Sequence, residues 1–320
     1  MPQLLPTVTT RALSVFDPDE LTEAVGSSNL MHTQVSSGAF AGELRATQLG
    51  SCRLDSGEYN QTLIARGAFP AGHVIVGYLL NAREPGRING FRFAQCDVVV
   101  FPQDVELDYF VPADTWWAAL QIPRTLLKDA RLEALPTRSA KVVPGSDEGG
   151  RRLGRVLREL LGLLQSHAPA SAVDAETQAQ TSWLESRLFD AVCDVLPHRS
   201  HAGARPQHVN RMQLLRRFER LVQDHAFSNL RIADVAAQLG VSQRTLEQGV
   251  KDYIGLSPIQ YLIRLRLNAV HRALMRGSED VATVDAIATT HGVTHLGRFS
   301  AYYRQQFGCN PSETLRARYR

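Results

Sequence analysis

Arginine dominates the basic residues near the C-terminal end of the chain. Between residues 205 and 320 there are 17 basic and nine acidic residues, and every basic one except Lys251 is arginine. The net charge of this part is +8, whereas residues 1–204 carry −5. A planar guanidinium group can bind a phosphate or the edge of a guanine through two hydrogen bonds. The C-terminal part is therefore predicted to meet a polyanion, although a solvated helix surface could have the same composition.

Two similar segments, 52 residues apart, would position these arginines. "RIADVAAQLGVSQRTL" begins at Arg231, and "TVDAIATTHGVTHLGRF" begins at Thr283. In both segments an alanine precedes a glycine by four positions, and Ser242 or Thr294 follows that glycine by two. A glycine in the left-handed conformation can end one helix, and the hydroxyl can cap the next. The pattern predicts two helix-turn-helix units, in which the second helix enters the major groove of DNA.

Residues 208–320 resemble the DNA-binding domain of the AraC/XylS family of transcription regulators. The resemblance rests on "VAAQLGVSQRTL", "GLSPIQYLIRLRLNAVHRAL" and "AIATTHGVTHLGRFSAYYRQQFGCNPSETLR", in that order. It implies seven helices, with two recognition helices in successive major grooves of double-stranded operator or promoter DNA. It also implies an unknown small-molecule effector, RNA polymerase as a partner, a homodimer, and activation more often than repression. The last of these segments is similar to a subgroup that includes regulators of amine catabolism.

The resemblance also implies which side chains of the two recognition helices meet DNA. Base contacts are expected from Gln243, Arg244, Glu247 and Gln248 in the first helix, and from His295, Leu296, Arg298 and Ala301 in the second. Phosphate contacts are expected from Ser242, Arg266, Thr294 and Arg304. The residues expected to face inward are Leu246, Val250, Phe299, Tyr303 and Phe307. The sequence departs from the family pattern at Gly249, Val250, Val293 and Gly297, which predicts slightly weaker helices.

Short runs of β-branched and aromatic residues fill the chain from about residue 42 to 123. Examples are "VIVGYLL", "DVVVFP", "VELDYFVP" and "WWAALQIP", separated by Gly, Pro, Asn and Asp. The pattern predicts an antiparallel sandwich or barrel, and it loosely resembles the cupin-like effector domain of the same family. Phe101, Tyr109, Trp116 and Trp117 are predicted to lie at an effector pocket, although an ordinary core would also explain them. Trp116 and Trp117 must point to opposite faces if they share a strand.

Residues 147–196 change to a helical period, with apolar stripes that could pack on the barrel or on a partner chain. The stripes include Leu153, Val156, Leu157, Leu160, Leu161, Leu164, Leu184 and Leu188. Residues 197–207, "PHRSHAGARPQ", have the composition of a linker. The predicted fold class is α+β: a cupin-like antiparallel β-barrel with amphipathic helices in residues 1–196, used for sensing and dimerisation, and an all-α domain in residues 208–320.

Two alternatives remain: an architectural DNA-binding protein without an effector, and a cupin-type metalloenzyme. The acidic N-terminal part, of about 200 residues, opposes the first alternative. Against the second, the barrel region has His73, with His32 just before it, and no His-x-His pair, while His198 and His201 lie in the linker. The four cysteines are far apart and form no CxxC pair, which favours scattered reduced thiols. Because the sequence also has no phosphate-binding glycine loop and no nucleophile elbow, no metal, cofactor or enzymatic activity is expected. Without a secretory signal or a long apolar run, the chain is expected to be cytoplasmic and to have no membrane partner.

Overall fold

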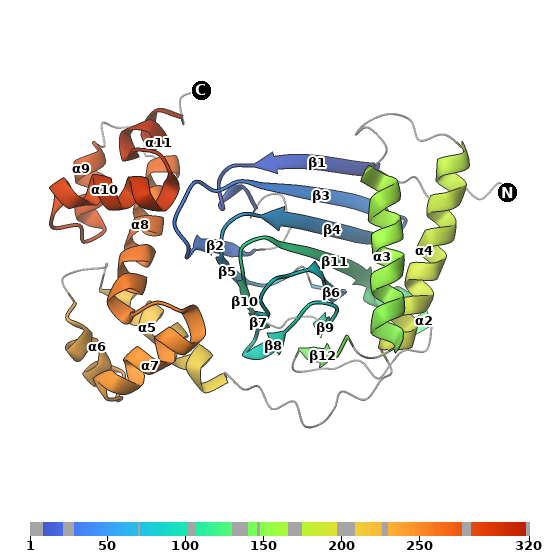
Figure 1. Cartoon of the computed structure of the whole chain (residues 1–320), viewed down its shortest axis with the longest axis horizontal. Helices are drawn as coiled ribbons and strands as arrows, with labels where there is room; N and C mark the ends of the chain where they lie inside the picture. Colours follow the sequence, from blue (N-terminus) through green and yellow to red (C-terminus); the bar gives the residue numbers. More distant parts are fainter. Residues whose placement is uncertain are drawn as a thin grey trace. The chain divides into compact units, whose positions relative to one another are not determined.

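The computed structural model describes most of the chain. The described residues are 9–21, 29–69, 71–101, 106–129, 140–145, 148–165, 175–196, 209–225, 230–276 and 283–317. By its internal contacts the chain divides into two units: residues 1–32 with 41–207, and residues 33–40 with 208–320. Strands with a few helices build the first unit, and helices dominate the second (Figure 1), which confirms the α+β layout. The linker predicted at residues 197–207 lies outside the described residues, and the exact domain boundaries stay predictions.

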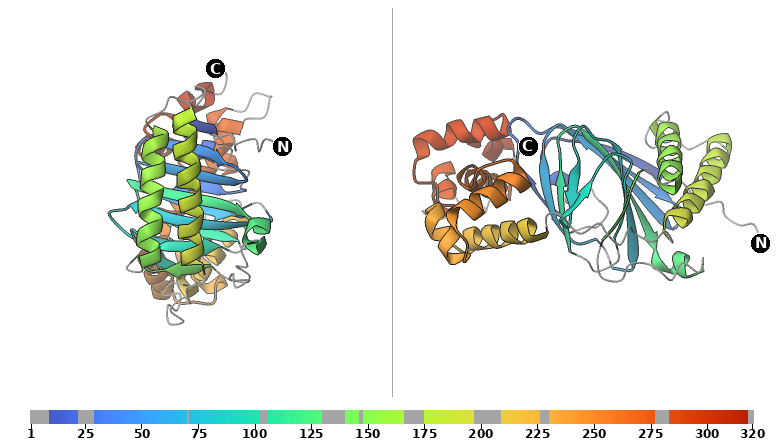
Figure 2. Two further views of the ribbon diagram at one scale, coloured as in Figure 1. Left: turned by 90° about the vertical axis from the view of Figure 1, so that its right-hand side faces the viewer. Right: turned by 60° about the horizontal axis from the view of Figure 1, so that its bottom comes forward.

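The described strands of the first unit form two antiparallel sheets (Figure 2). The first sheet has the order β1 (Thr9–Val15), β3 (Gly42–Leu49), β4 (Cys52–Tyr59), β11 (Thr115–Pro123), β6 (His73–Asn81), β9 (Val98–Phe101) and β12 (Lys141–Val143). The second has the order β2 (Met31–Gln34), β5 (Leu63–Gly67), β10 (Leu107–Val111), β7 (Gly86–Ile88) and β8 (Phe91–Phe93). Because no hydrogen-bonded ladder joins these two sheets in the described part, the strands do not form the closed barrel that the sequence predicted.

Strand β11 lies at the centre of the seven-stranded sheet and separates two apolar layers. It pairs with β4 on one side and with β6 on the other. Since successive side chains of a strand alternate between faces, Trp116 faces one layer and Trp117 faces the other. The short helix α2 (Arg124–Asp129) follows this strand directly. The prediction that the two adjacent tryptophans point in opposite directions is confirmed.

Helices α3 (Glu148–Gln165) and α4 (Ala175–Val195) cover one face of the seven-stranded sheet (Figure 2). Their leucine stripes are buried within the same chain, as at Leu157, Leu161 and Leu188, and share one core with the strands. Of the two partners that the sequence left open for these stripes, the chain's own sheet is the one observed. No helix among the described residues is both long and apolar enough to cross a membrane.

Seven helices occupy the described part of residues 209–317, as the resemblance implied. They are α5 (Val209–Asp224), α6 (Ile232–Gln238), α7 (Gln243–Ile254), α8 (Pro258–Arg276), α9 (Val284–Thr290), α10 (Leu296–Phe307) and α11 (Pro311–Ala317). The long helix α8 contacts both halves of this set. Its Tyr261 stacks on Phe218 of α5 at 6.1 Å between ring centroids, and its His271 stacks on Phe307 of α10 at 4.3 Å. Helix α8 therefore holds α5 and α10 in fixed positions.

Residues 33–40 belong to the second unit by their contacts and take part in a buried polar network. The side-chain nitrogen of Gln34 donates to the backbone carbonyl groups of Gly38 and Gln306 at 2.7 and 2.8 Å. The side chain of Asn268 bonds both the N–H and the carbonyl of the Gln34 backbone at 2.9 Å. Sequence reasoning did not predict this network, because it joins Gln34 to Asn268 and Gln306, which are 234 and 272 positions further along the chain.

Candidate nucleic-acid interface and interior cavity

The first helix-turn-helix unit, α6 and α7, has the turn that the sequence predicted. Gly240 has a φ of 69°, in the left-handed region that favours glycine. The N–H of Val241 donates to the carbonyl of Ala236 at 3.0 Å, which folds the chain back after α6. The Ser242 hydroxyl oxygen then accepts from the N–H of Thr245 at 3.0 Å. The predicted cap of α7 is therefore confirmed.

Helix α7 has one buried face and one exposed polar face. Leu246 and Val250 are buried, as predicted. The four side chains predicted to contact bases are all exposed: Gln243, Arg244, Glu247 and Gln248. Within this face, Gln243 donates to Glu247 at 2.8 Å. The pair holds an amide donor and a carboxylate acceptor next to each other on one face of the helix. Both kinds of group can bond the edge of a base.

Helix α5 adds polar groups that sequence reasoning missed. An open groove with about 1170 Å³ of empty space runs between α5 and α7. Its polar lining comprises Asn210, Gln213, Arg217, Arg244, Thr245 and Gln248. A Cβ atom on Gly249 would lie 2.8 Å from the terminal methyl Cδ2 of Leu214 in α5, so that side chain would have to move to accept any larger residue here. Gly249 was predicted only to weaken α7; the basic residues of α5 were the signal that could have revealed the groove.

The second helix-turn-helix unit, α9 and α10, repeats the turn but not the cap. Gly292 has a φ of 74°, and the N–H of Val293 donates to the Ala288 carbonyl at 3.0 Å. Helix α10 begins only at Leu296, and its N-cap residue, His295, makes no side-chain capping bond. The prediction that Thr294 caps this helix is therefore wrong. The physical reason is the glycine at position 297, which lowers the helical propensity of the first turn and shifts the helix start.

The inward face of α10 is aromatic, as predicted. Phe299, Tyr303 and Phe307 are buried, and successive ring centroids are 5.6 and 4.7 Å apart. Gly308 follows with a φ of 77° and ends the helix. The residues of this unit predicted to contact DNA are all exposed: Thr294, His295, Leu296, Arg298, Ala301 and Arg304. The aromatic residues therefore anchor α10, while its opposite face is free for contacts with another molecule.

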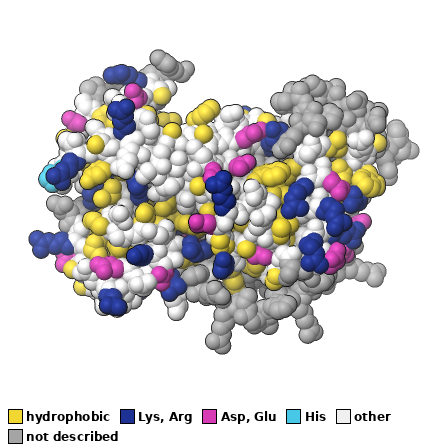
Figure 3. All heavy atoms as spheres, in the orientation of Figure 1, with side chains coloured by type: hydrophobic (Ala, Val, Ile, Leu, Met, Phe, Trp, Pro, Cys, Tyr) yellow, Lys and Arg dark blue, Asp and Glu magenta, His cyan; other side chains and the backbone are white. Residues whose placement is uncertain are grey.

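The arginines of the helical part of the chain, residues 208–320, differ in accessibility. Basic side chains, Lys and Arg in one colour, are visible at the left of Figure 3. Arg244, Arg298 and Arg304 are exposed, whereas Arg266 on α8 is half-buried. Burial lowers the pKa of Arg266 below its ordinary value, although the group stays charged at neutral pH. Arg266 therefore has less freedom than the other three to reach a phosphate.

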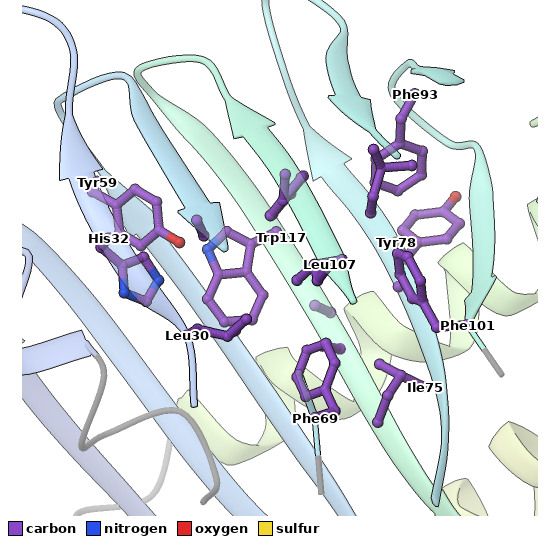
Figure 4. Close-up of a pocket in the computed structure, with 16 residues that line it drawn as sticks. Leu30, His32, Tyr59, Phe69, Ile75, Tyr78, Phe93, Phe101, Leu107 and Trp117 are labelled. Atoms are coloured by element: carbon purple, nitrogen blue, oxygen red, sulfur yellow. The ribbon is translucent and has the colours of Figure 1, made fainter. Parts of the chain in front are cut away.

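A partly open cavity lies between the two sheets of the first unit; its empty space is about 590 Å³ when the open solvent at its mouth is included. Figure 4 shows aromatic and aliphatic side chains around it, from both sheets. Three of the four predicted pocket residues line this cavity: Phe101, Tyr109 and Trp117. Trp116 does not; it packs instead against the core that the seven-stranded sheet shares with α3 and α4. The prediction that Trp116 lies at the pocket is wrong, because the sequence could not show which face of β11 lines the cavity.

Three polar groups, from His32, Tyr59 and Trp117, gather at one end of this cavity (Figure 4). Burial lowers the pKa of His32 to about 4, partly offset by a hydrogen bond to the backbone of Leu30. Burial and nearby Tyr109 raise the pKa of the Tyr59 hydroxyl well above its ordinary range. Trp117 Nε1 is buried and has no partner at hydrogen-bond geometry, while its proximity to the Tyr59 hydroxyl lowers the pKa of that hydroxyl and offsets part of the rise. The polar end is therefore uncharged at neutral pH.

Two helix-turn-helix units with exposed polar second helices, held by one long helix, define a DNA-binding domain of a transcription regulator. A family described as a helix-turn-helix domain matches residues 235–317. The chain is 38% identical over 92 residues to a probable thc operon regulatory protein of Rhodococcus erythropolis, covering 29% of this chain and 28% of that protein. It is 33% identical over 102 residues to a XylDLEGF operon transcriptional activator of Pseudomonas putida, covering 31% and 32%.

The chain belongs to the AraC/XylS family of transcription regulators through this C-terminal domain. It spans about a third of the length of these curated relatives. Among solved structures, the AraC-like transcriptional activator CuxR is 14% identical and covers 87% of this chain and 100% of its own, with a TM-score of 0.42. A probable AraC family regulator from Rhodopseudomonas palustris is 31% identical and covers 33% and 97%, with a TM-score of 0.31.

Proposed function

We propose that the protein is a ligand-responsive transcription regulator that binds operator DNA through α7 and α10. The observation that carries this proposal is the repeated turn at Gly240 and Gly292, each followed by an exposed polar helix. Two such helices allow two adjacent major grooves to be read by one chain. The name of one relative, a transcriptional activator, supports activation. RNA polymerase is the partner that the proposal assigns to an activator. Such a protein would act in the cytoplasm, on double-stranded DNA.

In this proposal the exposed faces divide the work of recognition. Base edges are read by Gln243, Arg244, Glu247 and Gln248 of α7, and by His295, Leu296, Arg298 and Ala301 of α10. Phosphates are bound by Ser242, Thr294, Arg304 and, less freely, Arg266. The groove between α5 and α7 adds Arg217, whose guanidinium donates to the Leu239 carbonyl at 2.7 Å and borders the same surface.

The cupin-like first unit would sense a small molecule in its interior cavity, with Phe101, Tyr109 and Trp117 at the ligand. A homodimer is also part of the proposal. Because the leucine stripes of α3 and α4 are buried within the chain, a dimer formed through these helices would use their outer side. Trp183 lies there, 59% exposed, with the guanidinium of Arg187 over its ring at 4.5 Å. An aromatic group of this kind is a frequent anchor of protein interfaces.

The test is selection of bound fragments from the source genome by the full-length chain, followed by gel-shift titration at several salt concentrations. We expect one or a few specific sites and an affinity that falls steeply with salt. Arg304→Ala should weaken binding to all sequences about equally, because it removes a phosphate contact. Arg83→Ala is the matched control, since Arg83 is an exposed arginine of the first unit, with 82% of its side chain accessible. Equal binding to every fragment would favour the architectural alternative instead.

The metalloenzyme alternative has no support among the described residues, where no three His, Cys, Asp or Glu side chains lie close enough to share a metal ion. Elemental analysis of the purified chain decides this point. A stoichiometric transition metal that survives dialysis against a chelator would revive the alternative, and a content near zero would discard it.

A further inference from the structure

The wall of the cavity in the first unit carries no charged side chain from the described residues. Among its described lining residues there is no lysine, arginine, aspartate or glutamate. A buried ion pair beside the cavity wall, between Arg66 and Asp108 at 2.6 Å, belongs to β5 and β10. Asp108 stands between Leu107 and Tyr109, which both line the cavity, so its carboxylate points to the other face of the sheet. An ion that entered this cavity would therefore find no counter-ion.

One polar group in the cavity wall, the indole N–H of Trp117, has no hydrogen-bond acceptor at suitable geometry among the described residues. The residue is only 7% exposed and lines the cavity. A buried indole N–H normally has an acceptor, because leaving it unpaired costs free energy. Gly57, opposite Trp117 on β4, would place a Cβ 3.0 Å from the indole ring, so its glycine leaves the ring the room to occupy this position.

We propose that this cavity binds an uncharged, mainly apolar molecule, aromatic or alicyclic, whose single hydrogen-bond acceptor pairs with Trp117 Nε1. The inference rests on the proposed sensor function and adds the chemical class of its ligand. Carboxylates and amines are disfavoured, because an ion transferred from water into an apolar cavity without a partner loses its hydration uncompensated. The similarity to regulators of amine catabolism therefore does not extend to the ligand.

The other polar groups of the cavity agree with an uncharged ligand. His32 is buried, and because its pKa is lowered to about 4 the imidazole is neutral at pH 7 and offers no positive charge to a carboxylate. Gly77 of β6 adds to the apolar space, because it has no side chain where the wall faces Phe101. A Cβ at Gly77 would meet Phe101 and Val99 at 3.8 Å or more, which is ordinary contact. A larger residue at this position can therefore fill the cavity without distorting the strand.

The test compares four small probes of similar size on the full-length chain: acetophenone, ethylbenzene, benzoate and benzylamine. Binding is measured by ligand-observed NMR and by the shift of the melting temperature. Acetophenone should bind about five-fold tighter than ethylbenzene, as expected for one added hydrogen bond, and both ions should bind more weakly still. Trp117→Phe should reduce the preference for acetophenone over ethylbenzene, because it removes the indole N–H that would pair with the acetophenone oxygen. Gly77→Leu should abolish the binding of both neutral probes.

The outcomes separate this inference from the proposed function. Tighter binding of either ion, an equal effect of Trp117→Phe on both neutral probes, or no binding of any probe would overturn the ligand class. Circular dichroism of Gly77→Leu verifies that the variant is folded. Gel shifts with the selected operator are run on the same variants, and loss of DNA binding by the unaltered chain would refute the regulator instead. If the chain still binds DNA but the probes do not bind in the expected order, the proposed regulator function stands and only the proposed class of ligand is refuted.

Discussion

Replacing Gly240 by alanine tests whether the left-handed turn is what separates α6 from α7. The residue has a φ of 69°, and an added Cβ would meet no heavy atom within 4 Å. The cost of the substitution therefore comes from the backbone conformation alone. For an L-amino acid the left-handed conformation costs roughly 1–2 kcal/mol. We expect Gly240→Ala to lower the free energy of unfolding of the second unit by about that amount.

The same substitution at Gly297 supplies a matched control with the opposite sign. Gly297 lies in the first turn of α10, has no left-handed φ, and would also place its Cβ in open space. Glycine in a helix is less stable than alanine by roughly 0.5–1 kcal/mol. Gly297→Ala should therefore raise the free energy of unfolding, although it adds the same atom.

Urea unfolding of the full-length chain, followed by far-ultraviolet circular dichroism, measures both changes. All three tryptophans, Trp116, Trp117 and Trp183, lie in the first unit, so their fluorescence should follow an unaltered transition in both variants. With a slope of about 1–1.5 kcal/mol per molar urea, the helical midpoint should fall by about 1 M in one variant and rise by less in the other. Shifts of the same sign would refute this account of the turn.

Three further predictions concern buried groups. Leu161 is 1% exposed in the core shared by α3, α4 and the sheet, so Leu161→Glu should unfold the first unit, at a cost above roughly 4 kcal/mol; a folded monomeric variant by sedimentation would place Leu161 at a dimer interface instead. Gln306→Leu removes the donor to the Gln34 and Ser36 carbonyl groups, so the second unit should lose about 1–3 kcal/mol, and an unchanged urea midpoint would contradict the network. Because burial lowers the pKa of His32 from 6.5 to about 4, its contribution to stability is complete above pH 6.5 and is lost as the pH falls toward 4, about 3 kcal/mol in all. Thermal melts of His32→Gln should lack this part of the pH dependence, and identical pH profiles would contradict it.

The helix-turn-helix units could be predicted because their determinants are local. The glycine at 240 or 292 sets the turn, the alanine four positions earlier allows close crossing, and both lie within one short segment. The inward aromatic face of α10 also followed from spacing alone. Spacing alone predicted a cap at Thr294 that the structure does not have. Whether a residue caps a helix with a weak first turn depends on small free-energy differences, which the spacing of residues does not reveal.

Features that depend on distant residues escaped prediction. Alternation showed that Trp116 and Trp117 diverge, but only the arrangement of two sheets decides which of them meets the cavity. The buried contacts of Gln34 with Asn268 and Gln306 join residues that no local pattern connects. The apolar stripes of α3 and α4 were equally compatible with a sheet and with another chain, since burial of apolar surface is non-directional.

The central claim, that α7 and α10 read two adjacent major grooves, is tested most directly by hydroxyl-radical footprinting of the full-length chain on its selected operator. The account predicts two protected segments about 10–10.5 base pairs apart for each bound chain. Arg244→Ala should weaken protection and relax base preference in one segment, and Arg298→Ala should do so in the other, each at a cost of roughly 1–3 kcal/mol. A single protected segment, or the same segment lost in both variants, would contradict it.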